Sequence, residues 1–458
     1  MWPSCASFMC RFGNCNNLQY IVNVDLLINM KYISPIDLKK GACMAEARYI
    51  TAREAATLLN VSMPTLYAYV SRGLIRSESV EGSARTRRYR REDVEHLQER
   101  KDVRRNPATA AAKALHLGMP VLDSAITCIA DGHVYYRGTD AVRLATTSSV
   151  EHVAAFLWLD RSDPDIGSLF AAGEYKLPSR CTAMQRRLSE LLTDLAPIER
   201  FQLMLPMAAT EDVAAYDLQP YAVAQTGARI MRLMTLITVG RSKGEHDLVR
   251  TLQDGWIADN PSAGPLLRSA LILCADHELN VSAFAARCVA SANATPYAVV
   301  MAGLAALTGA KHGGYTDQVE AFLAEVAMPE RASQVITNRL KRGERLPGFG
   351  HQLYPDGDPR AAALLSLVVK SHAKTAGVTL GKAVAAQVER SIGQKPTIDF
   401  ALAVLAHALK LPPGSALALF ALGRTIGWIA HAIEQYQLDQ LIRPRARYIG
   451  SAPQVEGV

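Results

Sequence analysis

Residues 308–314 read Thr308-Gly-Ala-Lys-His312-Gly-Gly314, and residues 346–351 read Leu346-Pro-Gly-Phe-Gly-His351. Glycines beside a histidine let the backbone and a ligand approach closely, and they supply any left-handed dihedral that is needed. The second motif runs on to Asp358-Pro-Arg360. Asp followed by Pro is typical of a helix N-cap and first turn, so Arg360 is expected at a helix N-terminus, which already favours an anion.

A third motif, Pro396-Thr-Ile-Asp399-Phe400, places a single carboxylate inside an apolar run. One histidine among apolar residues is more often a core residue than a ligand. Three such motifs between residues 308 and 400, joined by arginines, favour a functional site instead.

Long alanine- and leucine-rich amphipathic patterns surround these motifs from about Gly118 onward and predict a mainly α fold. Only Ile126–Arg137 looks strand-like, with Asp131-Gly132 as a hairpin turn. Of the 458 residues, 49% are hydrophobic and 20% are charged, which excludes wholesale disorder and allows two to four domains. No apolar run approaches the length of a membrane span, and Ser415–Leu422 is expected to be a buried helix.

The N-terminal end differs from the rest in composition and charge. Most of the net charge of +7 lies within residues 1–106, where an anionic polymer would bind. Residues 1–43 lack helical periodicity and the features of a signal peptide, so we expect either a disordered leader or a true start at Met44, without function. The eight cysteines show no Cys-x-x-Cys pairing, which favours a reducing cytoplasm and no metal site.

Residues 44–106 predict a small basic domain. Thr51-Ala-Arg-Glu54 is a capping box at the start of one helix, and Ser62 can cap a second helix that has Pro64 in its first turn and stops at Gly73. The result is a helix-turn-helix.

Five arginines follow in a presumed wing, Arg85-Thr-Arg-Arg-Tyr-Arg-Arg91. Together with Leu66-x-x-Tyr69 and Gly73-Leu74-Ile75, this segment resembles the winged helix-turn-helix of MerR-type regulators, in which the second helix enters the major groove and the wing contacts phosphates. A solvated charged surface is the simpler reading of an arginine run. Because the run follows a helix-turn-helix, we favour binding of double-stranded DNA. The candidate contacts are Tyr67, Arg72, Arg85, Arg87, Arg88, Arg90 and Arg91.

Further motifs occur in order along the C-terminal region. They include Asp276-His277-Glu-Leu-Asn, Gly423-Arg424-Thr-Ile-Gly-Trp-Ile-Ala-His431 and Ile442-Arg443-Pro-Arg. With the glycine–histidine motifs, they make residues 120–450 resemble the citrate synthase family. The resemblance implies an all-helical large domain (residues 107–312 and 410–458) and a small domain (residues 313–409) that closes over it.

The same resemblance implies the chemistry, which is condensation of acetyl-CoA with oxaloacetate and release of CoA, without a further cofactor. Asp399 matches the base that removes a methyl proton. His312 matches the residue that stabilises the enol, and His351 matches the donor to the ketone. The implied oxaloacetate ligands are His277, Arg360, Arg424, Phe420 and Arg443, the last supplied by the partner of a homodimer.

Elementary chemistry supports such a set. A methyl group beside a thioester is a very weak acid, so an ordinary carboxylate needs help from a donor at the thioester oxygen. Two carboxylates on the substrate need matched positive charge, which arginines provide. Gln352 and Lys311 depart from the residues common in the family, and the residues after Asp399 are less polar than is frequent there.

Two functions of different class therefore remain. One is an active citrate or 2-methylcitrate synthase with an N-terminal DNA-binding module. The alternative is a transcriptional regulator whose synthase-like body senses a metabolite and dimerises the chain. A sensor would need the arginines but not the base, so the intact set of Asp399, His312 and His351 favours the enzyme. A scaffold without either activity is the least favoured reading.

Overall fold

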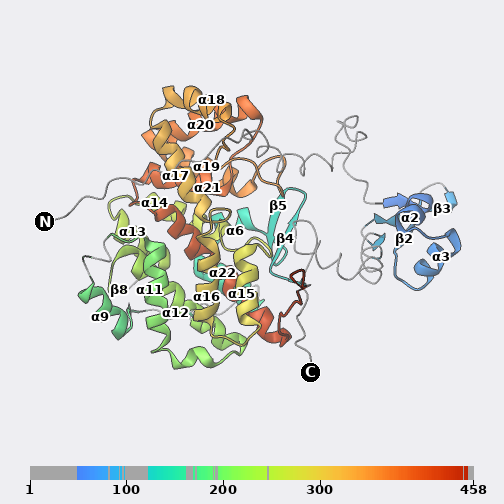
Figure 1. Ribbon diagram of the computed structural model, residues 1–458, viewed down its shortest axis with the longest axis horizontal. Coiled ribbons are helices and arrows are strands. Elements are labelled where there is room, and N and C mark those ends of the chain that lie inside the picture. Colours follow the sequence, from blue (N-terminus) through green and yellow to red (C-terminus); the bar gives the residue numbers. More distant parts are fainter. Residues whose placement is uncertain are drawn as a thin grey trace, which may run out of the picture. The chain divides into compact units, whose positions relative to one another are not determined.

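The computed structural model describes residues 49–80, 83–91, 93–94, 97, 122–160, 169–170, 173–188, 190, 194–244, 247–446 and 448–451. The chain divides into two compact units between Val121 and Leu122 (Figure 1). The expected leader, residues 1–43, and the expected boundary near residue 106 lie outside the described residues.

The described part of the N-terminal unit includes two short helices and a three-stranded sheet. Its elements are β1 (Tyr49–Thr51), α2 (Ala52–Leu59), α3 (Met63–Ser71), β2 (Ser77–Val80) and β3 (Ser83–Arg90), with antiparallel sheet order β1-β3-β2. The side chains that form its core come from both helices, from the sheet and from the segments beside them: Ile50, Ala55, Ala56, Leu59, Leu66, Ile75, Tyr89 and Val94.

The structure confirms two of the three predicted helix-end signals in this unit. The capping box is present, because the Glu54 amide donates to Thr51 Oγ1 and the Thr51 amide donates to Glu54 Oε2. Gly73 has φ +70° directly after α3, as a helix stop requires. The expected cap by Ser62 is wrong: its hydroxyl pairs with Thr65 Oγ1 at 2.9 Å and caps no backbone amide.

The C-terminal unit is mainly helical, as expected, and α22 (Ser415–Leu438) lies at its centre (Figure 1). Helices α12 (Pro220–Val239), α14 (Ala263–Leu273), α15 (Val281–Ala290) and α16 (Pro296–Leu307) pack against it. Gly303 of α16 allows the close approach, because a Cβ there would lie 2.4 Å from the ring of Trp428. The Trp428 side chain is fully buried.

The length of α22 corrects one expectation. Among the described residues it is the one helix long and apolar enough to cross a membrane, and the window that meets this test is completely buried. By mean hydropathy a helix of spanning length therefore does exist, although Arg424 and His431 interrupt its apolar sequence, and here it forms the core of the unit.

The strand-like segment forms a hairpin of β4 (Thr127–Ala130) and β5 (His133–Tyr136). Asp131 and Gly132 both have positive φ, as a two-residue hairpin turn requires. The sequence did not reveal β6 (Thr139–Asp140), which pairs with β5, or the short pair β7 (Tyr175–Lys176) and β8 (Lys243–Gly244).

The other described helices surround this core or carry the glycine–histidine motifs. They are α6 (Ala141–Thr147), α7 (Val150–Leu159), α9 (Ser179–Arg187), α11 (Pro197–Ala209), α13 (Leu248–Trp256), α17 (Gly314–Val326), α18 (Ala332–Lys341), α19 (Pro359–His372), α20 (Ala376–Ile392) and α21 (Ile398–Leu409).

Candidate active site

The loop before α19 holds His351 against the segment that precedes α21. The Gly350 amide donates to Lys395 O at 3.0 Å, and the Thr397 amide donates to Gly348 O at 2.9 Å. Gly348 has φ +85°, and a Cβ there would lie 2.9 Å from Val319. Only glycine satisfies both demands.

A backbone amide determines which ring nitrogen of His351 accepts a hydrogen bond. The Leu353 amide donates to Nδ1 at 3.1 Å. Burial, and secondarily the charge of Arg360, lowers the pKa of His351, which favours the neutral ring. A neutral imidazole that accepts at Nδ1 carries its proton on Nε2, so His351 is a hydrogen-bond donor there.

His277 lies beside His351, with ring centroids 5.3 Å apart. Its Nε2 forms a 2.8 Å hydrogen bond with the hydroxyl of Tyr354. Burial lowers the pKa of His277 well below its ordinary value, and the nearby charges of Arg360 and Arg424 lower it further. His277 is therefore neutral next to two cations.

Asp358 joins the N-termini of α19 and α21. It caps α19, its carboxylate accepts from Arg360 Nε and NH2 at 3.0 and 2.8 Å, and the Ile398 amide donates to its Oδ2 at 3.0 Å. Burial raises the pKa of Asp358, but the Arg360 charge and hydrogen bonds outweigh this and hold the pKa below its usual range. Arg360 thus stands at a helix N-terminus as expected, but in a buried ion pair that the sequence did not predict.

Asp399 lies in the first turn of α21, one residue after the amide that binds Asp358. Its oxygens accept hydrogen bonds from Thr316 Oγ1 at 2.7 Å and from Thr397 Oγ1 at 3.3 Å. Burial raises the pKa of Asp399 despite these hydrogen bonds and the nearby Arg360. A carboxylate with a raised pKa is a stronger base than an exposed one.

His312 precedes α17, and its Nε2 lies at a hydrogen-bond distance of 2.8 Å from the Ser282 hydroxyl. Burial, with a smaller effect from Arg424, lowers the pKa of His312 to about 4. The adjacent glycines serve close backbone approach, since a Cβ on Gly314 would lie 2.6 Å from Thr308 O. Neither adopts the left-handed conformation that the sequence allowed.

Arg424 projects from the middle of α22. Its Nε donates to Cys274 O at 2.8 Å, and its Cζ lies 4.8 Å from the centre of the Phe420 ring. That ring meets His312 edge-on, with centroids 6.2 Å apart. Within the described residues, the hydrogen bond from Nε is the one that the Arg424 side chain makes, and its terminal nitrogens make none. A buried guanidinium end without a partner suits an anionic ligand.

Two buried groups fix the segment that carries His277. Asp276 accepts from Thr127 Oγ1 at 2.6 Å and lies 3.3 Å from His431 Nε2. The Gly427 amide donates to Ala275 O at 2.9 Å. Because His431, Gly427 and Arg424 all belong to α22, this helix positions both the segment and Arg424.

The structure therefore brings together seven of the eight expected catalytic and substrate-binding residues of the C-terminal unit. They are His277, His312, His351, Arg360, Asp399, Phe420 and Arg424. Arg443 is different: it is exposed in the stretch after α22 and makes no hydrogen bond or ion pair with any described residue.

Sequence reasoning missed the residues that orient these side chains: Ser282, Thr316, Tyr354, Asp276 and His431. Asp358 was read only as a helix cap. Asp276, Ser282 and His431 lie inside or beside the quoted motifs, so a search of those motifs for buried polar residues could have found them. Thr316 and Tyr354 carry no comparable signal.

The N-terminal candidates have unequal exposure. Tyr67 on α3, Arg72 directly after it, and Arg87 and Arg88 on β3 are exposed. Arg90 and Arg91 are partly buried, and each interacts with another residue. Arg85 belongs to β3, but its side chain lies outside the described residues.

Two family models match this chain. The model described as "Citrate synthase, C-terminal domain" matches residues 114–445, and the model described as "Helix-turn-helix domain" matches residues 49–102.

Similar proteins agree with the first of these models. "Citrate synthase 2" of Bacillus subtilis is 28% identical over 354 residues, which are 73% of this chain and 94% of that protein. "2-methylcitrate synthase 1" of Corynebacterium glutamicum is 31% identical over 200 residues, 43% of this chain and 52% of that one.

Solved structures show the same fold. A citrate synthase from Thermotoga maritima has 25% identity and a TM-score of 0.60, over 74% of this chain and 96% of that one. A citrate synthase from Thermoplasma acidophilum was solved as a ternary complex with carboxymethyl coenzyme A and oxaloacetate. It has a TM-score of 0.65 and 22% identity, and the match covers 75% of this chain and 97% of that one.

Proposed function

The chain belongs to the citrate synthase family, and we propose that it condenses acetyl-CoA or propionyl-CoA with oxaloacetate, giving citrate or 2-methylcitrate and free CoA. The acyl group arrives already activated as a thioester, so the proposed reaction needs no further cofactor. One methylene distinguishes the two acyl groups, and such a difference is worth only about 1–3 kcal/mol of discrimination.

Asp399 and His312 would form the enol. Asp399 takes a proton from the methyl carbon next to the thioester carbonyl, and its raised pKa suits this role. The electron pair of that C–H bond moves toward the thioester oxygen, where His312 donates a hydrogen bond. This role requires the His312 proton on Nδ1, so the Ser282 hydroxyl has to turn its proton from Asn280 Oδ1, which accepts it at 2.8 Å, to His312 Nε2.

His351 would activate the ketone of oxaloacetate. Its Nε2 proton is directed by the backbone hydrogen bond at Nδ1, so it can polarise the ketone oxygen and then protonate the alkoxide that forms with the new C–C bond. Arg360, Arg424 and His277 would bind the carboxylates. Water then hydrolyses the thioester of the condensation product and releases the CoA thiol.

The observation that carries this proposal is that a buried carboxylate with a raised pKa, three neutral histidines and two arginines lie together in one site. A metabolite sensor would need the arginines alone. Such a regulator is the second candidate function, and the helix-turn-helix favours it.

Release of free thiol distinguishes the two candidates. The purified chain is expected to release CoA thiol from acetyl-CoA or propionyl-CoA only when oxaloacetate is present, which a thiol reagent measures directly. Butyryl-CoA and assays without oxaloacetate are the controls. Background release with every acyl-CoA would contradict the enzyme and favour the sensor.

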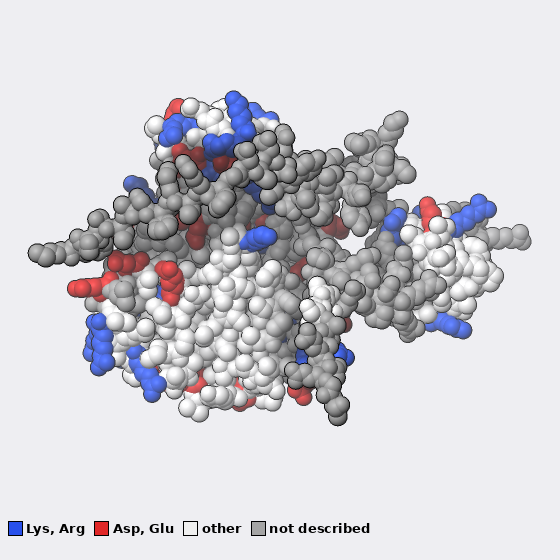
Figure 2. All heavy atoms as spheres, viewed as in Figure 1, with Lys and Arg blue, Asp and Glu red and all other residues white. Residues whose placement is uncertain are grey.

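We also propose that the chain works as a homodimer. Helices α15 and α16 together carry one charged side chain, Arg287, and it is fully buried. Figure 2 shows the resulting surface, largely free of Lys, Arg, Asp and Glu, over these helices. An uncharged surface of this kind is typical of the core of a subunit interface.

The role of Arg443 tests the dimer sharply. If Arg443 completes the site of the partner subunit, Arg443→Ala and His312→Ala should each be inactive as homodimers. Mixed dimers would then contain one site with both residues intact, and random pairing should restore about a quarter of wild-type activity. Co-purification of differently tagged chains isolates the mixed dimers. Absence of recovery in them would show that Arg443 does not act across subunits.

The N-terminal unit is proposed to bind double-stranded DNA, supported by the helix-turn-helix match and by the exposed arginines of β3. We also propose a cytoplasmic location, which the four free cysteines of the described residues support.

A further inference from the structure

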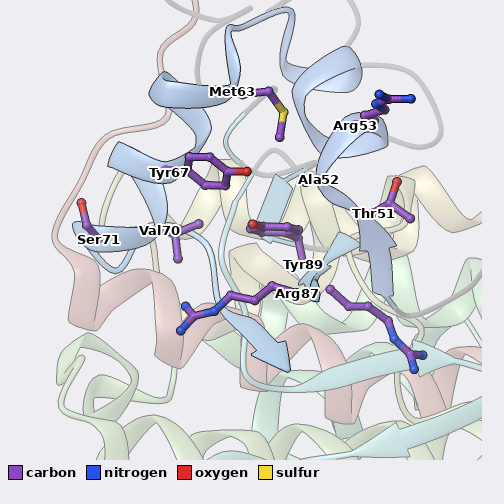
Figure 3. Close-up of a pocket in the computed structure, with 10 residues that line it drawn as sticks. Thr51, Ala52, Arg53, Met63, Tyr67, Val70, Ser71, Arg87 and Tyr89 are labelled. Carbon is purple, nitrogen blue, oxygen red and sulfur yellow. The ribbon is translucent and has the colours of Figure 1, made fainter. Parts of the chain in front are cut away.

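A groove of about 1040 Å³ lies in the N-terminal unit between α3 and β3 (Figure 3). Met63, Tyr67 and Val70 of α3 face Tyr89 of β3 across it. Its polar residues lie at the start of α2, at the end of α3 and on β3: Thr51, Arg53, Ser71, Arg87 and Arg88. The groove thus combines an apolar floor with three arginines.

These three arginines are exposed. Arg87 reaches Ser77 through NH1 only at 3.4 Å, which leaves most of its donors available. Among the described residues none that lines the groove is acidic, although Glu54 bonds to Thr51 at its edge and Glu78 pairs with Arg88 between β2 and β3. Exposed arginines match the phosphates of a nucleic acid backbone, to which arginine can donate two parallel hydrogen bonds.

Helix α3 has unusual chemistry for a helix that would read base sequence. Its nine residues, Met63-Pro-Thr-Leu-Tyr-Ala-Tyr-Val-Ser71, include no Arg, Lys, Asn, Gln, Asp or Glu. Those six types make the base-specific contacts in the major groove, most of them bidentate. The exposed groups of α3 are hydroxyls and apolar surface, which discriminate weakly between base pairs. Arg72 follows at the C-terminal end, whereas base contacts in such motifs come from the N-terminal part of the helix.

We propose that this groove seats the sugar-phosphate backbone of duplex DNA, and that the unit binds duplexes of different base sequence with nearly equal affinity. The inference rests on the proposed DNA binding and adds that contacts with phosphates supply the binding affinity. Affinity then depends steeply on salt, because each neutralised phosphate contributes about −0.9 to the slope of log K against log salt concentration.

Fluorescence anisotropy with the full chain and short labelled duplexes tests the proposal. We expect A·T-rich, G·C-rich and mixed duplexes to bind within about tenfold of one another, whereas a specific reader prefers its site by about 10³-fold or more. Selection from a randomised duplex library should yield no consensus. A consensus with such a preference would overturn the proposal while leaving DNA binding intact. Absence of any binding at about 50 mM salt would instead overturn DNA binding itself.

A charge-matched pair of variants locates the binding surface. Arg87→Ala/Arg88→Ala should reduce the steepness of the salt slope by about 2 and weaken all duplexes equally. Arg331→Ala/Lys382→Ala removes two exposed charges from the C-terminal unit and should leave the salt slope and the affinity for each duplex unchanged. Both variants should keep wild-type thiol release, which shows that they are folded. An unchanged slope in the first variant would show that the groove is not the phosphate path.

Discussion

Asp399→Asn is expected to lower kcat for thiol release by about 10²–10⁴-fold, the usual contribution of a positioned base. The amide keeps the shape of the side chain and can accept from Thr316 through its oxygen while its NH2 donates to Thr397, but it cannot accept the methyl proton. Binding of oxaloacetate depends on the arginines and histidines, so KM for oxaloacetate should change little.

Stability gives this variant a second, independent readout. Burial raises the pKa of Asp399, so the folded protein binds its proton more tightly than the unfolded chain does. Wild-type stability is therefore lost as pH rises through the folded pKa, and near neutral pH the ionised carboxylate is destabilising. Asp399→Asn should accordingly be at least as stable as the wild type in urea at pH 7 while it is nearly inactive.

The matched control is Asp356→Asn, which makes the same change at an exposed carboxylate of the loop between His351 and α19. Its activity should equal that of the wild type. Wild-type kcat in Asp399→Asn, or a large loss of stability with the loss of activity, would contradict the assignment of Asp399 as the base.

The sequence predicted the local features of this site because they depend on neighbours along the chain. The N-cap at Asp358, the helix stop at Gly73 and the hairpin at Asp131-Gly132 all follow from short-range rules. The long helix α22 was only partly recognised, because its polar members Arg424 and His431 interrupt the apolar run although both are buried.

The features that were missed join distant residues. Asp358 binds the amide of Ile398, Ser282 binds His312, and Thr316 binds Asp399. Each of these contacts depends on how helices pack, which no local pattern records. The same reason explains the wing, where Arg90 and Arg91 look like Arg87 and Arg88 in sequence but are partly buried.

His312→Ala is expected to lower kcat by about 10²–10³-fold, the loss seen when one preorganised oxyanion donor is removed. The donor works because it is held before the reaction, by the hydrogen bond to Ser282 and by the ring contact with Phe420. Ser282→Ala should therefore also reduce kcat, but by less than His312→Ala, since the ring loses only its orientation. Steady-state kinetics with both variants measures the difference. Equal kcat for His312→Ala and the wild type would contradict the role.

The pH dependence of stability tests whether this histidine is neutral when the site is ready to react. Burial lowers the pKa of His312 to about 4, whereas the ordinary value is 6.5. Between pH 6.5 and about 4 the histidine is protonated in the unfolded chain but neutral in the folded site. The stability that the neutral His312 contributes is therefore complete above pH 6.5 and is lost as pH falls toward 4. His312→Gln has no such proton, and its unfolding free energy in urea should fall less than that of the wild type across this range. A parallel fall in both proteins would mean that His312 is protonated in the folded site, and the neutral donor on which the enol step depends would be lost.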